Sequence, residues 1–138
     1  MSRSGYSEDC ENLELWRHNV ERTLGGKRGQ AFLKDLRAAL DALPEPKRLI
    51  AHELKAATGE VCAMGSVGLL RGLDMSKVED YEPQDVGDLF GISSMMAQEI
   101  AYINDEVGYR ETPEARYERV SRWVNENLLA SPGAEEKR

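Results

Sequence analysis

Residues 83–103 read PQDVGDLFGISSMMAQEIAYI, which carries the signals of two short helices joined by a tight turn. Pro83 suits the first turn of a helix, where the missing N–H is not needed. Gly91 indicates the end of that helix, because glycine tolerates the left-handed conformation that closes a helix. Ser93 or Ser94 can cap the second helix, whose apolar residues recur at helical spacing. The run therefore predicts two packed helices in an all-α fold.

Four more helices are predicted outside this run, and three of them have clear signals at one end. Apolar residues at helical spacing predict one helix over residues 8–24 and another over residues 30–43, before Pro44. Thr112 followed by Pro113 predicts the start of the last helix, since threonine caps a helix and proline fits its first turn. The core residues expected on this last helix are Tyr117, Val120, Val124 and Leu128.

Residues 60–72, EVCAMGSVGLLRG, are almost continuously apolar and include several small residues. We interpret this segment as a buried helix, in which Gly65 and Gly68 allow another helix to approach closely. A small β-hairpin near Gly59 is the alternative, because periodicity alone does not assign short apolar runs. The residues expected to lie mostly out of water are Val61, Cys62, Met64, Val67 and Leu70.

The length and composition fit one domain. The chain has 138 residues, of which 41% are hydrophobic and 31% charged, and this favours a packed core over disorder. We expect a single compact helical domain of five to seven helices over residues 1–130 and a flexible polar tail over residues 131–138. No apolar run reaches the roughly 20 residues of a membrane span, and no apolar signal-peptide core is seen, so a cytoplasmic location is expected.

The negative charge is concentrated in one part of the chain. Residues 74–114 contain eleven acidic and two basic residues, a local charge of −9 in a chain of net charge −7. Clustered charge of one sign steers association with an oppositely charged partner. We therefore predict binding to a protein with a basic surface. The residues expected to make this contact are Glu79, Asp80, Glu82, Asp85 and Asp88.

The spacing in residues 83–103 is also that of a helix-turn-helix, so a DNA-binding regulator is the alternative function. However, the second helix contains no Lys or Arg, and Asp85 and Asp88 on the first helix would repel the phosphate backbone. We therefore do not expect nucleic acid as the partner. A homodimer could offset this repulsion. It would have to place Arg17, Lys27 and Arg28 on the phosphates.

Two groups of cations have two interpretations each. Lys27 and Arg28 lie among three glycines before the helix predicted at residues 30–43, where backbone N–H groups attract anions. They form either an anion site or a tight turn with solvated cations. Along the last helix, three arginines recur at every third position. Together they form either a solvated strip or a strip that pairs with the acidic segment. These residues are Arg116, Arg119 and Arg122.

No catalytic residue, metal or cofactor is predicted. An enzyme would rest on a histidine close to residues 104–106, Asn-Asp-Glu, but no nucleophile motif supports it. Cys10 and Cys62 are expected to be buried, reduced thiols, since no secretory signal precedes them. Only His18 and His52 could join them as metal ligands, and the spacing is not that of a zinc site.

Four short stretches carry a resemblance to a known group of proteins. They are RSGYSEDC at residues 3–10, GKRGQAFL at residues 26–33, GEVCAMG at residues 59–65 and ETPEAR at residues 111–116. The chain resembles small uncharacterised proteins of tailed bacteriophages and prophages of proteobacteria, from Arg3 to about Leu128. The resemblance implies a phage origin and a bacterial cytoplasm, and it supplies no catalytic residues. We therefore predict a non-enzymatic phage accessory protein, whose partner is expected to be a host nucleic-acid-handling or defence protein.

Overall fold

The computed structural model of the protein describes residues 3–4, 13–108 and 110–129, and the tail predicted at residues 131–138 lies outside them. The described residues contain six α-helices and one short 3-10 helix, without a strand, so the predicted all-α fold is confirmed. In chain order they are α1 (Leu13–Gly25), α2 (Lys27–Asp41), α3 (Ala63–Arg71), η1 (Met75–Lys77), α4 (Pro83–Phe90), α5 (Ser94–Asp105) and α6 (Pro113–Asn127).

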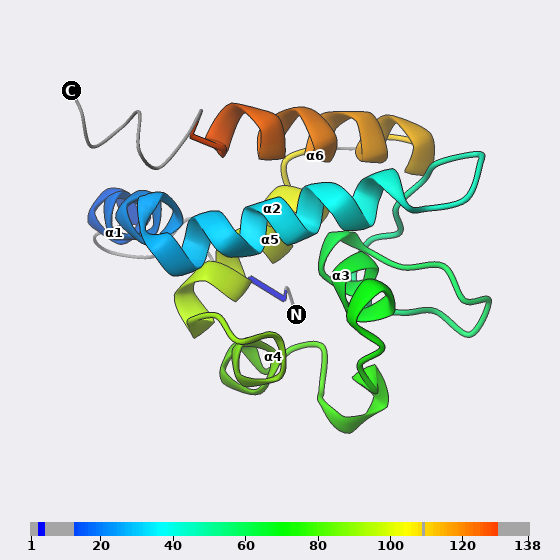
Figure 1. Cartoon of the computed structure of the whole chain (residues 1–138), viewed down its shortest axis with the longest axis horizontal. Coiled ribbons are helices and arrows are strands. Elements are labelled where there is room, and N and C mark those ends of the chain that lie inside the picture. Colours follow the sequence, from blue (N-terminus) through cyan, green and yellow to red (C-terminus); the bar gives the residue numbers. More distant parts are fainter. Residues whose placement is uncertain (1–2, 5–12, 109, 130–138) are drawn as a thin grey trace.

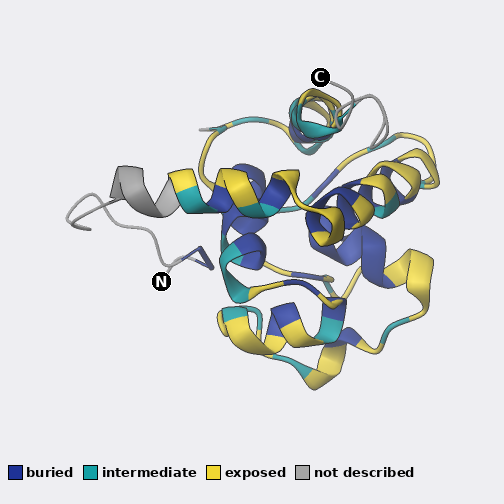
Figure 2. Cartoon of the chain, turned by 60° about the vertical axis from the view of Figure 1, so that its left-hand side comes forward, coloured by how far each residue is buried: buried dark blue, intermediate teal, exposed yellow. Residues whose placement is uncertain are grey.

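The helices pack around α5 (Figure 1). This helix contacts α1, α3, α4 and α6, and none of its residues is exposed. On the other side of the core, α2 packs against α1, α3 and α6. Figure 2 shows buried residues where the helices face one another and exposed residues on their outer sides. Phe32 of α2 and Phe90 of α4 meet edge to face in this core, with ring centroids 6.4 Å apart.

The capping signals of the sequence form as predicted. Gly91 closes α4 with a φ of 76°, and the Ile92 N–H donates to the Gly87 carbonyl at 2.9 Å. The Ser93 hydroxyl accepts from the Met96 N–H at 3.1 Å and so caps α5. The Thr112 hydroxyl accepts from the Ala115 N–H at 3.1 Å and caps α6 in the same way. These two local hydrogen bonds fix the residues at which α5 and α6 begin.

The boundary between the first two helices differs from the prediction. α2 begins at Lys27 rather than at residue 30, with Gly26 as its N-cap. Gly29 therefore lies inside the first turn of α2, where it is buried. A Cβ at Gly29 would overlap the backbone carbonyl oxygens of Thr23 and Leu24, so this glycine allows the end of α1 to approach α2.

The segment at residues 60–72 is a helix only from Ala63, and its first half is buried as predicted. Leu70 was expected in the core, but it is 48% exposed, because the buried part of α3 ends at Gly68 and the last turn of the helix lies outside the core. The expected helix crossing is also wrong. A Cβ at Gly65 would overlap the Leu54 carbonyl oxygen, and a Cβ at Gly68 would overlap the Met75 side chain, so the close neighbours are a loop and η1.

The β-hairpin considered near Gly59 is reduced to one bridge. Lys55 and Val61 form an isolated antiparallel bridge, and Gly59 turns between them with a φ of 94°. The Ala56 N–H donates to the Glu60 carbonyl at 2.8 Å within the same loop. No helix among the described residues has the length and apolar character of a membrane span.

Candidate functional site

The acidic segment contains one exposed group of carboxylates, on α4 and the loop before it. Residues 79–88 hold five acidic residues and neither Lys nor Arg. Four of the five are exposed, and none of the four forms an ion pair with a described residue. We call these four residues the acidic strip: Glu79, Glu82, Asp85 and Asp88.

The packing of α4 determines which way the strip faces. Val86, Gly87 and Phe90 are buried, so Asp85 and Asp88 lie on the opposite, outer side of the helix. Figure 2 shows this division between the buried and the exposed sides of the helices. An acid in the first turn of α4 is also favoured by the positive end of the helix dipole. The packing of α4 therefore holds Asp85 and Asp88 of the strip on the outer side of the helix.

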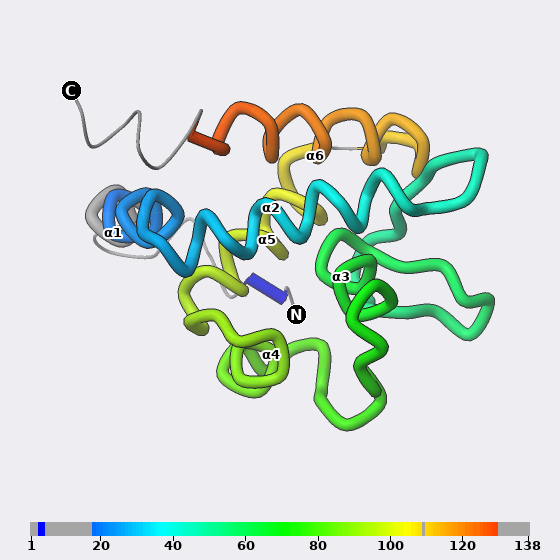
Figure 3. Tube along the Cα trace, viewed as in Figure 1, coloured from blue at the N-terminus to red at the C-terminus, as the bar shows by residue number. Residues whose placement is uncertain are grey.

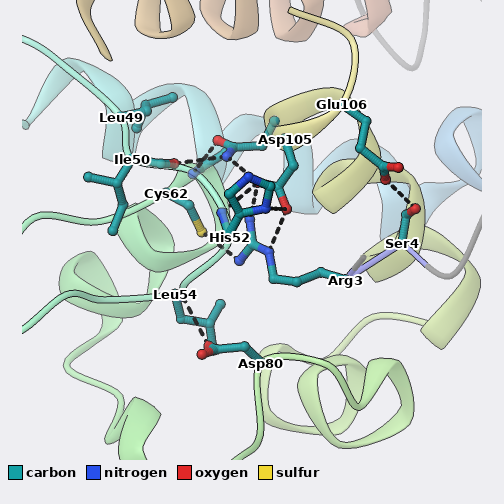
Figure 4. Close-up of polar contacts among 12 residues, drawn as sticks. Arg3, Ser4, Leu49, Ile50, His52, Leu54, Cys62, Asp80, Asp105 and Glu106 are labelled. Carbon is teal, nitrogen blue, oxygen red and sulfur yellow. Dashed lines mark hydrogen bonds and ion pairs between the residues drawn. The ribbon is translucent and has the colours of Figure 1, made fainter. Parts of the chain in front are cut away.

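Asp80, the fifth predicted contact residue, has a structural role. It is half-buried, and its Oδ1 accepts from the Leu54 N–H at 3.0 Å. This hydrogen bond joins the loop at residues 51–62 to the segment that leads into α4. The two residues are shown in Figure 4. Of the five residues predicted to bind a partner, Asp80 is thus the one that joins two distant segments, whereas Asp88 accepts only from the Gln84 side chain one turn earlier, at 3.0 Å.

An open groove adjoins the start of the acidic strip. It has a volume of about 530 Å³ and lies between residues 54–57, the C-terminal end of α3 and η1. Leu69 contributes an apolar wall and is 46% exposed, and Val78 and Asp80 line the end of the groove next to Glu79. Beyond Asp80, Tyr81 is 41% exposed. Exposed apolar groups therefore lie directly beside the unpaired carboxylates.

A second polar group is buried at the end of α5 (Figure 4). Arg3 and Ser4 lie inside the fold beside this helix, as the short blue segment in Figure 3 shows. The Arg3 guanidinium donates to both carboxylate oxygens of Asp105, at 2.7 and 2.6 Å, and to the Cys62 sulfur at 3.4 Å. Burial alone would lower the pKa of Arg3, but Cys62 and Asp105 stabilise the cation and raise it.

Asp105 is held as a carboxylate. Burial alone would raise its pKa, but the hydrogen bonds and charge of Arg3, the His52 N–H and the Asn104 amide hold it below its usual value. The His52 N–H donates at 3.0 Å and the Asn104 amide at 2.8 Å, both to Oδ1. The oxygen Oδ2 accepts from Arg3 and lies 3.8 Å from the His52 ring nitrogen Nδ1.

The structure thus brings together most of the residues on which an enzyme would rest. Asn104, Asp105 and His52 meet, whereas Glu106 accepts a hydrogen bond from Ser4 instead. Both oxygens of Asp105 are already occupied by donors, so this carboxylate is not free to take a proton from a substrate. No group of residues within the described part of the chain could hold a metal ion. We call the buried group of Arg3, Cys62 and Asp105 the clamp, because its hydrogen bonds join three distant parts of the chain.

Cys62 belongs to this clamp as a cap and not as an exposed thiol. Its sulfur accepts from the Gly65 N–H at 3.4 Å at the start of α3, and the residue is fully buried. The predicted buried, unpaired thiol is confirmed for Cys62. Cys10 lies outside the described residues. Arg3 had no local signal in the sequence, since its contact with Asp105 spans 102 residues.

Two of the three arginines of α6 pair with the acidic segment. This agrees with the second interpretation of the basic strip, in which it pairs with that segment and is not solvated. Arg116 and Arg119 both reach Glu111, at 3.4 and 2.5 Å. They also donate to the last carbonyls of α5, Arg119 to Ile103 at 2.6 Å and Arg116 to Asn104 at 3.1 Å. The hydrogen bond from Arg119 holds the pKa of Glu111 below its usual value. A solvated strip fits only Arg122, which is exposed.

Lys27 and Arg28, the predicted anion-binding pair, lie in the first turn of α2 and are exposed. Together with Arg22 they line a hollow of about 330 Å³ that also reaches Ser93 at the start of α5. α2 has neither a side-chain cap nor an acidic residue in its first turn. Cations at this positive end of a helix are unfavourably placed. Anion binding here stays a prediction.

α4 and α5 are two packed helices joined by a short turn that contains Gly91, as the helix-turn-helix spacing predicts. A recognition helix must lay an exposed face in the major groove of DNA. Every residue of α5 is buried or half-buried, so this helix has no such face. The geometry therefore does not favour DNA reading by α5.

Comparison of the chain with protein-family models, with curated proteins and with solved structures found no match. These comparisons assign neither a family nor an activity. The charges and contacts of the described residues therefore carry the functional proposal.

Proposed function

We propose that this protein is a non-enzymatic accessory protein that binds a basic protein partner through the acidic strip. The observation that supports this proposal is that the four carboxylates of the strip are exposed and form no ion pair with any described residue. Some carboxylates elsewhere are paired with arginine, for example Asp35 with Arg71 and Glu111 with Arg119. Unpaired charge of one sign raises the rate of association with an opposite surface.

The rigidity of α4 supports this role. Gly87 packs so closely against the Ile92–Ser93 turn that a Cβ there would lie 2.7 Å from the Ile92 carbonyl oxygen. Phe90 is buried against Phe32, which fixes the other end of the helix. A preorganised surface loses little conformational entropy on binding. The strip can therefore present its carboxylates to a partner without rearrangement.

The partner we propose is a host protein with a basic groove, such as a nucleic-acid-handling or defence protein. Carboxylates along one side of a helix present a row of negative charges, as phosphates do along a nucleic-acid backbone. The resemblance to phage and prophage proteins supports a bacterial cytoplasm as the setting. Occupation of such a groove would compete with nucleic acid for the same cations.

A pull-down from bacterial lysate tests this proposal at about 50 mM and about 500 mM salt, because screening weakens surface electrostatics. We expect a partner that is retained at low salt and released at high salt. A variant without the strip charges should lose this partner. Its substitutions are Glu79→Gln, Glu82→Gln, Asp85→Asn and Asp88→Asn.

A matched control removes the same number of exposed carboxylates elsewhere and should keep the partner. It neutralises Glu21, Glu53, Glu118 and Glu126, all of which are exposed. Equal loss of the partner in both variants would show that net charge and not the strip is responsible, and a lysate without any salt-sensitive partner would sink the proposal.

The DNA-binding alternative is tested on the same protein. Because α5 has no exposed face, binding would have to use the cations Arg22, Lys27 and Arg28 around the start of α2. A gel shift with duplex DNA at about 50 mM salt, where phosphate contacts are strongest, decides this. We expect no shift, and a shift that is lost in Lys27→Glu would favour the alternative.

A further inference from the structure

We infer that the groove beside the acidic strip takes an apolar side chain from the basic partner, so that the recognised segment is an apolar anchor followed by cations. This inference rests on the proposed function and names the chemistry of the segment that is bound. The groove and the strip are continuous, since Val78 and Asp80 line the groove and Glu79 between them is exposed and belongs to the strip.

The apolar side chains of one wall of the groove are exposed to water, which is energetically unfavourable. Leu69 lies on the α3 side of the groove and is 46% exposed, and Leu73 and Val78 are half-buried in the same wall. Removing such surface from water is favourable in proportion to its area. An apolar side chain that enters the groove would cover Leu69, and water would leave both surfaces.

The charges around the groove differ from those of the strip. Asp74 and Asp80 line the groove, but Lys55 lines it as well, and Lys77 lies close enough to act on Asp74. Asp74 is also occupied within the chain, because its Oδ1 accepts from the Ser76 N–H at 3.1 Å. The groove is therefore close to neutral, and the unbalanced negative charge begins at Glu79.

This distribution predicts which groups lie next to each other in the bound segment of the partner. An apolar side chain suits the near-neutral groove, and lysine or arginine side chains suit the strip that follows. α4 has 8 residues and is therefore about 12 Å long. An extended segment of about four residues spans the same length. The strip can thus accommodate several consecutive cations behind one apolar anchor.

A second copy of this chain fits the surface less well than a basic partner does. The chain has a net charge of −7, and residues 79–88 hold five acidic residues without a cation. Two copies that met through the strip would bring like charges together, which opposes association. Charge complementarity therefore favours a partner of opposite sign.

Two synthetic peptides test the inference, both labelled with fluorescein and titrated with the full-length protein at about 50 mM salt. One peptide, GLLGRRRR, carries apolar residues before its arginines, and the other, GSSGRRRR, carries serines there. We expect GLLGRRRR to bind about ten-fold more tightly by fluorescence anisotropy, as burial of a leucine side chain implies.

Two adjacent leucines of α3 provide a matched pair of variants. Leu69 lines the groove, whereas Leu70 does not, and the two are 46% and 48% exposed. Leu69→Ser should remove the preference for GLLGRRRR, and Leu70→Ser should keep it. Because both side chains are about equally exposed on the same helix, differences in folding do not explain such a result.

The outcomes separate the groove from the strip. If the wild-type protein binds both peptides equally, or if the two serine variants behave alike, the groove inference is overturned and the strip proposal stands. If neither peptide binds, or if the variant without the strip charges binds both as the wild type does, the proposed function fails. The expected pattern is weaker binding of both peptides by the strip variant, and loss of only the apolar preference in Leu69→Ser.

Discussion

The guanidinium of Arg3 and the carboxylate of Asp105 form a two-pronged ion pair, at 2.7 and 2.6 Å, between residues 102 positions apart in the sequence. Only 3% of the Arg3 side chain and 2% of the Asp105 side chain are exposed. The pair connects the start of the chain to the end of the central helix α5. Removal of either partner would leave a buried charge without compensation.

We therefore expect Arg3→Ala to lower the free energy of unfolding by about 3–5 kcal/mol, the usual effect of breaking a buried pair. Urea denaturation followed by circular dichroism measures it. The control is Arg48→Ala, which breaks the largely exposed pair of Arg48 and Glu60 and should cost less than about 1 kcal/mol. Similar losses in the two variants would mean that the Arg3 pair does not hold the fold.

The same pair predicts how stability depends on pH. The pKa of Asp105 is lower in the folded protein than its usual value of 3.8, as is the pKa of Glu111 relative to 4.5. A carboxyl whose pKa is depressed by folding stabilises the protein above its unfolded pKa. That contribution is lost as the pH falls through the folded pKa.

We accordingly expect the melting temperature of the wild type to fall steeply below about pH 4. Asp105→Asn should be less stable at neutral pH, and its melting temperature should depend less on pH in the acidic range. Thermal melts between neutral and acidic pH measure both. A variant whose acid dependence equals that of the wild type would contradict a role for Asp105 in the acid sensitivity.

The parts of the fold that follow from the sequence are those with local signals. The caps at Ser93 and Thr112 and the turn at Gly91 involve contacts within five residues, so sequence alone located α4, α5 and α6. The exposed strip could also be predicted, because an acid is costly to bury unless it is paired.

Other features depend on contacts that no local pattern records. The clamp forms between Arg3, Cys62 and Asp105, which come from three distant parts of the chain. Leu70 was expected in the core because residues 60–72 are almost continuously apolar, so periodicity could not show that the helix leaves the core after Gly68. The internal role of Asp80 depends on a hydrogen bond to Leu54, 26 residues away.

Gly65 should be intolerant of any side chain. A Cβ at this position would overlap the Leu54 carbonyl oxygen, which belongs to backbone and cannot rotate away. We expect Gly65→Ala to lower the free energy of unfolding by about 1–3 kcal/mol through overpacking. Gly25→Ala is the control, because nothing lies within 4 Å of a Cβ there, and it should be neutral or stabilising. Chemical denaturation of both variants measures the difference, and equal stabilities would contradict the close approach at Gly65.

Lys27 offers the last test, since its charge lies at the unfavourable end of a helix dipole. It is in the first turn of α2, a turn without acidic residues. Lys27→Glu should therefore stabilise the protein by about 0.3–1 kcal/mol at low salt. Lys34→Glu makes the same change of charge at an exposed position further along α2 and should not give this gain.

Phosphate then separates the two interpretations of Lys27 and Arg28. If the pair holds an anion, phosphate should raise the melting temperature of the wild type more than that of Lys27→Glu, because ligand binding stabilises the folded state. If the cations are only solvated, both proteins should respond alike. Melting curves with phosphate and with chloride at the same ionic strength distinguish specific binding from general screening. An equal response would leave the dipole effect as the whole consequence of the Lys27 charge.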